Sequence, residues 1–336
     1  MPMQTEYKLL GLSPHPFVTY TLKPHYRSEL VCTDSFGFRQ NYGSDGVPLD
    51  LRTIRSRYQQ CRLLLGGSVA FGIGASSDRK TMAALLTTPQ RPFLNLGVSA
   101  AACQQELAYY LALRHLLPEV TDVVLFTGFN EAVHAGLREA EVHPEFGGTV
   151  LGEMRLPPPP PGPLTRLVRK GRGVVSSVVS GAPAAAEEWA RTEVEDNLLP
   201  PELVELRLRA TLDRTVQTMK IWRIFQDALD MRVHYVLQPS IGWTTKRLTE
   251  LERSRWEEDQ VQLGKAVRWL ATEVVHQRLR DELETGAKEA GIRFYDANDW
   301  LADGYDNTTI FIDVAHFDDA GQQIVADELE RRLDWR

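Results

Sequence analysis

Short apolar runs recur along the chain, and glycine or small polar residues follow directly after most of them. A strand buried on both faces of a parallel sheet is continuously apolar, so each run predicts such a strand. The five predicted strands are Arg62–Gly66, Phe93–Val98, Asp122–Thr127, Val233–Leu237 and Ile292–Tyr295.

Between these runs, apolar residues recur at the spacing of a helix. The stretches with this spacing are 104–117, 203–231, 250–290 and 319–333, and a further helix could begin at 81–86. Strands that alternate with helices predict a parallel sheet covered by helices on both faces. In such folds ligands bind at the carboxyl ends of the strands, which is where the unusual residues lie.

Two regions depart from this alternation. Residues 1–60 are rich in Pro, Tyr and Gly, and they predict an N-terminal arm packed on a main domain of residues 61–336. Residues from about 131 to 200 include Gly147-Gly148 and the run Pro157–Pro161, which cannot continue a strand-helix rhythm. We interpret this stretch as an insertion that is either a lid or an oligomer surface, so a homo-oligomer is one expected assembly.

Composition and charge narrow the class of protein. Of the 336 residues, 43% are hydrophobic and 25% are charged, as in globular proteins. The formal net charge of −7 argues against a general nucleic-acid binder. No stretch approaches the ~20 apolar residues that span a bilayer. The first residues lack the pattern of a signal peptide, so we expect a cytoplasmic protein without an integral membrane segment.

Cysteine and histidine spacing gives no metal signal. The three cysteines are widely spaced, which suggests neither a disulfide framework nor a zinc site. The histidines outside the C-terminal region lack the ligand spacing of a metal site. The sequence therefore predicts no metal and no cofactor.

Candidate chemistry follows the first three predicted strands. Ser68 comes after Gly66-Gly67, and these glycines allow a tight turn that presents a hydroxyl. Gly97 and Ala100 lie in the turn after the second strand. Asn130 follows the third strand, where its amide is a donor suited to a developing oxyanion. Each feature alone is also typical of an ordinary turn or of a loop-capping asparagine.

An Asp-x-x-His pair lies between the apolar residues Thr309–Ile312 and the last predicted helix. Asp313 precedes His316 by three residues, a spacing at which its carboxylate can accept the imidazole Nδ1–H and stabilise the imidazolium. A surface aspartate and a helix-capping histidine would give the same pattern, so the pair by itself is only moderately specific.

The chain order of these four features resembles that of the SGNH (GDSL-like) hydrolase family, which is named after four such blocks. The resemblance covers roughly residues 62–131 and 238–336. Thr33–Arg39 in the arm is also similar to a segment that often precedes the nucleophile block in bacterial members. The family resemblance implies a three-layer α/β/α, flavodoxin-like sandwich with a five-stranded parallel sheet.

Carried over block by block, the resemblance implies a Ser-His-Asp esterase. Ser68 resembles the nucleophile, His316 the general base and then acid, and Asp313 the residue that orients the imidazole. The implied activity is cleavage of a small-molecule acyl ester through an acyl-serine intermediate. The expected substrate carries a small acyl group on a carbohydrate or a secondary metabolite.

The resemblance also implies an oxyanion hole. Its donors would be the backbone N–H groups of Ser68 and Ala100 and the side chain of Asn130, with Gly97 as the fallback for the second donor. Ala100 stands where the family usually has a glycine, and Glu131 stands where an aspartate usually follows the asparagine. Neither departure removes a catalytic atom.

Other readings of the same residues stay open. An acyltransferase with an alcohol or sugar acceptor would use the same atoms, and a non-catalytic binding protein could retain the fold. The apolar residues Phe71, Phe129 and Trp243 are candidates for an acyl pocket, although burial in the core accounts equally well for the first two.

Overall fold

The computed structural model describes residues 10–15, 17–136, 201–262, 265–302 and 304–336. In chain order the elements are β1 (Leu12–His15), β2 (Thr19–Leu22), β3 (Asn41–Tyr42), β4 (Pro48–Leu49), α2 (Ile54–Arg57), β5 (Gln60–Gly66), α3 (Ser68–Phe71), η1 (Asp78–Lys80), α4 (Met82–Leu85), β6 (Phe93–Asn95), α5 (Cys103–Leu113), η2 (Arg114–Leu116), β7 (Glu119–Thr127), α6 (Phe129–Gly136), α9 (Pro201–Leu229), β8 (Arg232–Leu237), α10 (Glu250–Gln262), α11 (Lys265–Leu270), α12 (Glu273–Ala290), β9 (Arg293–Asp296), η3 (Asp299–Leu301) and α13 (Asp319–Arg332).

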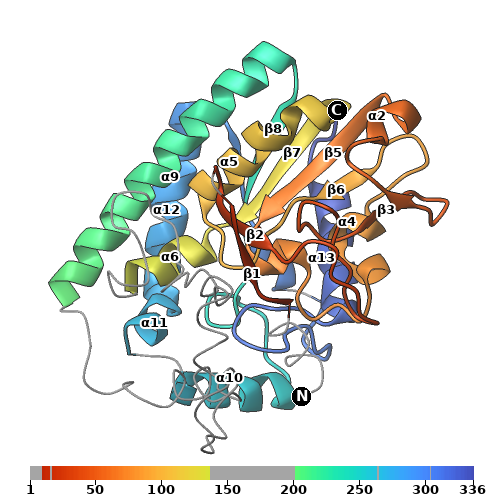
Figure 1. The fold of residues 1–336 in the computed structure, drawn as a ribbon. Helices are drawn as coiled ribbons and strands as arrows, with labels where there is room; N and C mark the ends of the chain where they lie inside the picture. Colours follow the sequence, from red (N-terminus) through yellow and green to blue (C-terminus); the bar gives the residue numbers. More distant parts are fainter. Residues whose placement is uncertain (1–9, 16, 137–200, 263–264, 303) are drawn as a thin grey trace, which may run out of the picture.

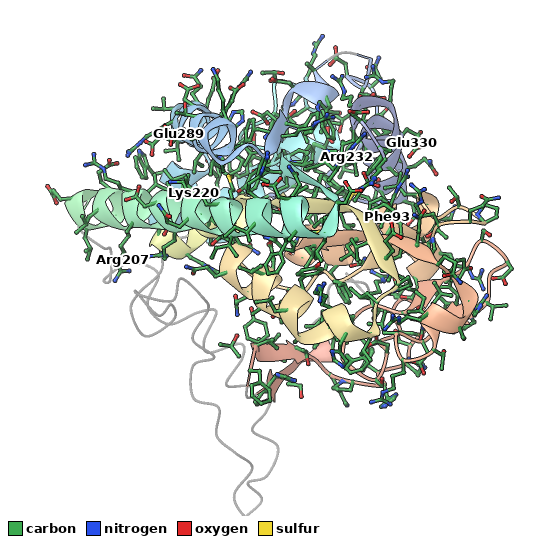
Figure 2. All side chains as sticks on the ribbon, turned by 90° about the horizontal axis from the view of Figure 1, so that it is seen from above. Phe93, Arg207, Lys220, Arg232, Glu289 and Glu330 are labelled. Atoms are coloured by element: carbon green, nitrogen blue, oxygen red, sulfur yellow. The ribbon has the colours of Figure 1, made fainter. Side chains whose placement is uncertain are left out.

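A five-stranded sheet of order β6-β5-β7-β8-β9 forms the centre of the molecule, and every neighbouring pair in it is parallel. Helices α5, α9 and α12 cover one face, while α4 and α13 pack together on the other (Figure 1). Seen from above, α9 runs along one side past Arg207 and Lys220, and Glu289 marks α12 beside it (Figure 2). The predicted three-layer α/β/α sandwich with a five-stranded parallel sheet is confirmed.

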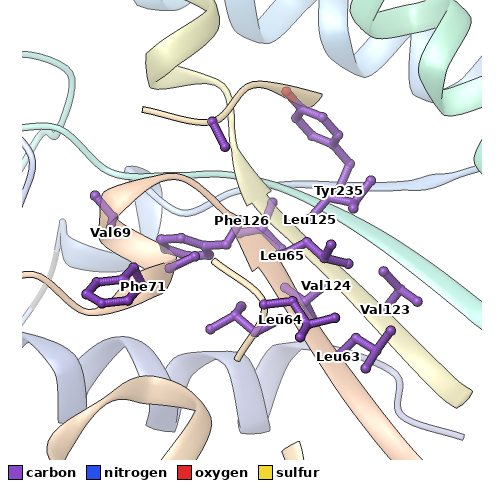
Figure 3. Packing of buried hydrophobic residues seen from close by; sticks show 14 of the residues in the cluster. Leu63, Leu64, Leu65, Val69, Phe71, Val123, Val124, Leu125, Phe126 and Tyr235 are labelled. Atoms are coloured by element: carbon purple, nitrogen blue, oxygen red, sulfur yellow. The ribbon is translucent and has the colours of Figure 1, made fainter. Parts of the chain in front are cut away.

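The central strands are apolar because both of their faces are covered. Leu63–Leu65 of β5 and Val123–Phe126 of β7 are completely or almost completely buried. Their side chains pack together in the core with Tyr235 of β8 (Figure 3). Because these residues are buried on both faces of the sheet, they form uninterrupted apolar runs in the sequence, and those runs predicted the strands.

Two predicted elements need the largest corrections, since most other bounds differ by one to three residues. β6 ends at Asn95 rather than Val98, because the chain turns at Gly97 to pass close to α3. A side chain at Gly97 would place its Cβ 2.4 Å from the backbone nitrogen of Phe71. The predicted helix 250–290 is three helices in the described residues, and the indole N–H of Trp243 donates to the carbonyl of Leu270 (3.0 Å) where α11 ends.

Residues before β5 pack against the sheet domain in two small antiparallel sheets, β1-β2 and β3-β4. The ring of Phe38 meets Tyr109 of α5 edge to face, with centroids 5.6 Å apart. Tyr20 and Phe38 belong to the same buried cluster as the central strands. Of the stretch interpreted as an insertion, residues 131–136 belong to α6, and 137–200 lie outside the described residues. Within the described part of the chain, no helix combines the length and apolar character needed to cross a membrane.

Candidate active site

Ser68 lies at the carboxyl edge of the sheet, at the start of α3 and directly after β5. The turn is tight: a Cβ on Gly66, whose φ is +152°, would lie 2.2 Å from the carbonyl oxygen of Phe126. A Cβ on Gly67 would lie 2.2 Å from the Nδ2 atom of Asn130. The two glycines therefore let the serine turn pass close to the strand and asparagine beside it.

His316 contacts Ser68 across 248 residues of sequence. The Nε2 atom of His316 lies 2.7 Å from Oγ of Ser68, within hydrogen-bond distance. On the other side of the ring, Nδ1 lies 2.7 Å from Oδ2 of Asp313 and 2.9 Å from Oδ1. The structure thus brings Ser68, His316 and Asp313, the three side chains predicted from the sequence, into one hydrogen-bonded chain.

Asp313 is held in place by its own loop. Its Oδ1 atom accepts the backbone N–H groups of Ala315 (3.0 Å) and His316 (2.8 Å). Burial acts to raise the pKa of Asp313, but the His316 charge and these hydrogen bonds outweigh burial and lower the pKa to about 2. Asp313 is therefore a carboxylate throughout the neutral range.

The imidazole of His316 responds in the opposite sense. Burial acts to lower the pKa of His316, but the charge and hydrogen bond of Asp313, together with the charge of Asp259, raise that pKa above its ordinary value. A base of raised pKa accepts a proton more readily from a neighbouring hydroxyl.

Asp259 on α10 is a further acidic group near this pair, and the sequence analysis did not select it. Its Oδ2 atom is buried without a hydrogen-bond partner. Burial and the charge of Asp313 raise the pKa of Asp259 to about 6, against the opposing effect of the Val314 backbone N–H. No spacing in the sequence links residue 259 to the Asp-x-x-His pair, so sequence alone gives no signal for it.

Glu252 of α10 forms a buried ion pair and also binds the backbone just before the loop that carries Asp313 and His316. Nζ of Lys246 lies 2.6 Å from Oε2 of Glu252, and neither side chain is exposed. Oε1 of Glu252 accepts the backbone N–H groups of Ile310 (2.8 Å) and Phe311 (3.2 Å). Arg255, one helical turn further on, donates to the carbonyl of Phe311 (2.6 Å). The loop is therefore fixed from α10 just before Asp313.

The side chain of Asn130 lies beside the serine turn. Its Nδ2 atom donates to the carbonyl of Ala101 (2.7 Å), which uses one of its two amide hydrogens. Ala100 adopts a left-handed backbone conformation with φ +61°, which normally favours glycine. The backbone N–H of Gly97 donates to Oδ1 of Asn95 (2.9 Å), so Gly97, the fallback donor, is already engaged.

Two buried acids, Glu106 and Glu131, contact the end of β7 and the turn before Asn130. Oε1 of Glu131 accepts the backbone N–H of Cys103 (2.7 Å), and Oε2 accepts that of Gly128 (2.9 Å). Thr127 Oγ1 lies 2.7 Å from Oε1 of Glu106 and 3.2 Å from Oε1 of Glu131. Glu131 therefore ties the start of α5 to the turn that precedes Asn130.

Burial raises the pKa of both acids, and their mutual repulsion raises that of Glu106 further, well above its ordinary value. Oε2 of Glu106 is buried without a hydrogen-bond partner, which suits a neutral carboxyl group better than a charged one. The sequence does carry a signal for Glu106, since it falls at helical spacing with the buried Cys103, Leu107 and Tyr110.

The three residues predicted to line an acyl pocket are buried. Phe71 is 0% exposed and packs in the core, where Figure 3 shows it near Val69. Trp243 is 1% exposed, and its ring lies edge to face with Phe129 at a centroid distance of 5.2 Å. Phe129 itself is 7% exposed. Phe71 and Trp243 are thus core residues in this structure, because their rings fill space between secondary-structure elements.

Among the described residues, no group of three or more His, Cys, Asp or Glu side chains is arranged to hold a metal ion. The notable feature of this edge of the sheet is the arrangement of a hydroxyl, an imidazole and a carboxylate.

Neither a family model nor a curated protein sequence matches the chain. Among solved structures, the chain is similar to an acetylxylan esterase from Geobacillus stearothermophilus, with 11% identity, a TM-score of 0.42 and coverage of 83% of this chain and 96% of that one. It is also similar to a lipolytic protein of the G-D-S-L family from Veillonella parvula, with 11% identity, a TM-score of 0.39 and coverage of 82% and 98%.

An extracellular lipase from Streptomyces rimosus is similar at 16% identity, with a TM-score of 0.40 and coverage of 82% of this chain and all of that one. The functional proposal below is drawn from the sheet order and from the distances between the side chains of Ser68, His316 and Asp313.

Proposed function

We propose that the protein is a serine ester hydrolase that forms an acyl-serine intermediate. The observation that carries this proposal is the continuous hydrogen-bonded chain from Ser68 Oγ through His316 to Asp313, with both outer distances at 2.7 Å. A nucleophile, a base and a group that orients the base are the parts required for acyl transfer to a hydroxyl.

In the proposed reaction, Oγ of Ser68 attacks the ester carbonyl while Nε2 of His316 takes the hydroxyl proton. Asp313 stays ionised and stabilises the imidazolium. The tetrahedral intermediate collapses, and His316 returns the proton to the departing alcohol. Water then attacks the acyl-serine with His316 again as the base, which releases the acid and restores the hydroxyl.

The proposed oxyanion donors are the backbone N–H groups of Ser68 and Ala100 and the amide of Asn130. Support comes from the close approach of Asn130 Nδ2 to the Gly67 turn, directly before the nucleophile. Preorganised donors of this kind stabilise the charge that develops on the carbonyl oxygen.

The proposed substrate carries a small acyl group on a carbohydrate or a secondary metabolite. The burial of Phe71 and Trp243 in the core supports a small acyl group, since neither ring presents surface to a long chain. A panel of esters from acetyl to octanoyl tests this part, and a preference for the octanoyl ester would contradict it.

The test of the proposed function is hydrolysis of p-nitrophenyl acetate, together with mass mapping of a fluorophosphonate adduct. We expect wild type to turn over the ester and to carry the adduct on Ser68. Ser68→Ala and His316→Ala should lose turnover while keeping the wild-type circular dichroism. The control is Ser56→Ala, an exposed serine in α2. Equal turnover by wild type and Ser68→Ala would refute the proposal, and product formation with added alcohols in place of water would point to a transferase.

A further inference from the structure

Arg39 is a fully buried arginine outside the proposed catalytic residues, and it lies in the segment before β5. Its side chain is 1% exposed. Its Nη1 atom donates to the carbonyl of Gly72 (2.6 Å), Nε donates to Oδ1 of Asp78 (2.8 Å), and Nη2 donates to the carbonyl of Leu30 (2.8 Å). The guanidinium also lies over the ring of Phe71, 5.3 Å from its centroid. Burial of such a charge is tolerated because it is paired and hydrogen-bonded.

The Gly72 carbonyl lies at the carboxyl end of α3, the short helix that begins with Ser68. A helix of four residues has little stability of its own, and its last carbonyls need partners from elsewhere. Arg39 supplies a charge-assisted partner at that end. Arg39 therefore binds the carboxyl end of the short helix that carries Ser68.

Tyr20 makes a matching contact with the second turn of the site. Its side chain is buried, and its hydroxyl donates to the carbonyl of Ser99 (3.1 Å). Ser99 directly precedes Ala100, which holds an unfavourable left-handed conformation. A strained residue persists only where its surroundings hold it, and Tyr20 is one such restraint. Tyr20 is in turn fixed by Tyr109, whose hydroxyl donates to its carbonyl (2.9 Å).

The turn before Arg39 explains how this arginine points inward. Oδ1 of Asp34 accepts the backbone N–H of Phe38 (3.0 Å), which closes the turn. Gly37 has φ +88°, and a Cβ there would lie 2.1 Å from the carbonyl oxygen of Leu22. Only glycine fits at this position, so the turn has one close-packed arrangement.

We infer that Arg39 and Tyr20 are positioning residues for ester cleavage: Arg39 holds the helix that carries Ser68, and Tyr20 holds the turn that carries Ala100. This inference rests on the proposed function, since it assigns the two residues to the support of the Ser68 nucleophile and of the proposed oxyanion donor. The segment before β5 then contributes to ester cleavage by positioning residues of the site.

The test compares kcat, KM and the rate of fluorophosphonate labelling in Tyr20→Phe and Arg39→Lys, with kcat expressed per labelled serine. Small displacements of reacting groups cost up to about 10²-fold in rate, so we expect kcat and the labelling rate to fall about tenfold in each variant with KM changed less than about twofold. Normalising to labelled serine removes any contribution from unfolded protein.

The controls are Tyr110→Phe, which is matched to Tyr20 in burial, and Arg27→Lys, at an exposed arginine in the same segment as Arg39. Tyr110 is a buried tyrosine whose hydroxyl contacts the sulfur of Met231, and Arg27 donates within its own segment to the carbonyl of Tyr26. Both controls should keep wild-type kcat.

The outcomes separate the two proposals. A wild type without turnover or labelling contradicts the proposed function. An active wild type with unchanged kcat and labelling rate in both Tyr20→Phe and Arg39→Lys overturns the positioning role. If Arg39→Lys fails to fold, Asp78→Asn replaces it, because this variant removes the charge that Arg39 pairs with. An unchanged kcat in Asp78→Asn then overturns the positioning role of Arg39, and a reduced kcat supports that role.

Discussion

Nδ1 of His316 lies 2.7 Å from Oδ2 of Asp313, and the same carboxylate also accepts two backbone N–H groups of its own loop. These contacts fix which imidazole nitrogen carries the proton, so that Nε2 faces Ser68 as an acceptor. In the proposed mechanism, this hydrogen bond selects the tautomer in which the imidazole can act as a base.

Replacing Asp313 with Asn should lower kcat/KM by about 10⁴-fold, because the amide would stabilise the wrong tautomer and remove the charge that supports the imidazolium. Steady-state kinetics on an activated ester measure the loss. Asp327→Asn, which removes a carboxylate from the outer side of α13, should leave the rate unchanged. A loss of less than tenfold in Asp313→Asn would contradict the assignment.

Asn130→Ala should lower kcat by about 10²–10³-fold with a smaller effect on KM, because it removes one donor to the developing oxyanion. The variant also loses the hydrogen bond to Ala101, so thermal melting must accompany the kinetics. Asn307→Ala, at an exposed position, serves as the control. A purely structural asparagine would lower the melting temperature without changing kcat per labelled serine.

Asp259→Asn should move the acidic limb of the kcat/KM profile to lower pH. The charge of Asp259 helps raise the pKa of His316, so its removal lets the imidazole lose its proton, and become a base, at lower pH. A pH series on an activated ester measures the shift. Glu258→Gln alters an exposed neighbour on the same helix and should shift the limb less. An unchanged or upward-shifted limb would count against the electrostatic role of Asp259.

The wild-type protein should lose stability as pH rises and Glu106 gives up its proton, and Glu106→Gln should remove this loss. The pKa of Glu106 is raised in the folded protein, so the folded state binds this proton more tightly than the unfolded state does, and stability falls as pH rises above about 4.5. An uncharged amide has no such dependence. Denaturant unfolding from pH 5 to 8 should therefore show a flatter dependence in the variant. A parallel loss of stability in both proteins would disprove the neutral acid.

Ala100→Gly should raise the free energy of unfolding by about 0.5–1 kcal/mol, since the left-handed conformation costs alanine roughly 1–2 kcal/mol and glycine loses part of that gain in chain entropy. Urea unfolding curves measure the change. Ala100→Val should shift the midpoint the other way, because a β-branched residue tolerates this conformation less well. A glycine variant less stable than wild type would show that the turn is unstrained.

Strand and block positions were predictable because they depend on local patterns. Val123–Phe126, the centre of the run that predicted β7, is apolar and buried. Asn130 lies just after the end of that strand, beyond Gly128. Such features depend only on residues that are close together in the sequence. The strand-helix alternation indicated a parallel sheet, and this places Ser68 and Asn130 at the same edge, because each follows a strand of that sheet.

Long-range polar contacts were not predictable in the same way. The carboxylate of Glu252 accepts the backbone N–H groups of Ile310 and Phe311, which lie more than fifty residues away in the sequence. No residue spacing indicates this contact. At the end of α11, within the helix predicted at 250–290, the carbonyl of Leu270 accepts the indole N–H of Trp243, a residue distant in the sequence. The burial of Phe71 depends on what packs over it, whereas the sequence gives only its hydrophobicity.

The separation of the reacting hydroxyl and imidazole by 248 residues has a consequence during synthesis. At 5–20 residues per second, a ribosome adds His316 roughly 10–50 s after Ser68. A nascent chain thus carries the serine for that whole interval without this imidazole. Under the proposed mechanism, translation products that end within the interval lack the base and should not cleave esters, whatever part of the sheet they have already folded.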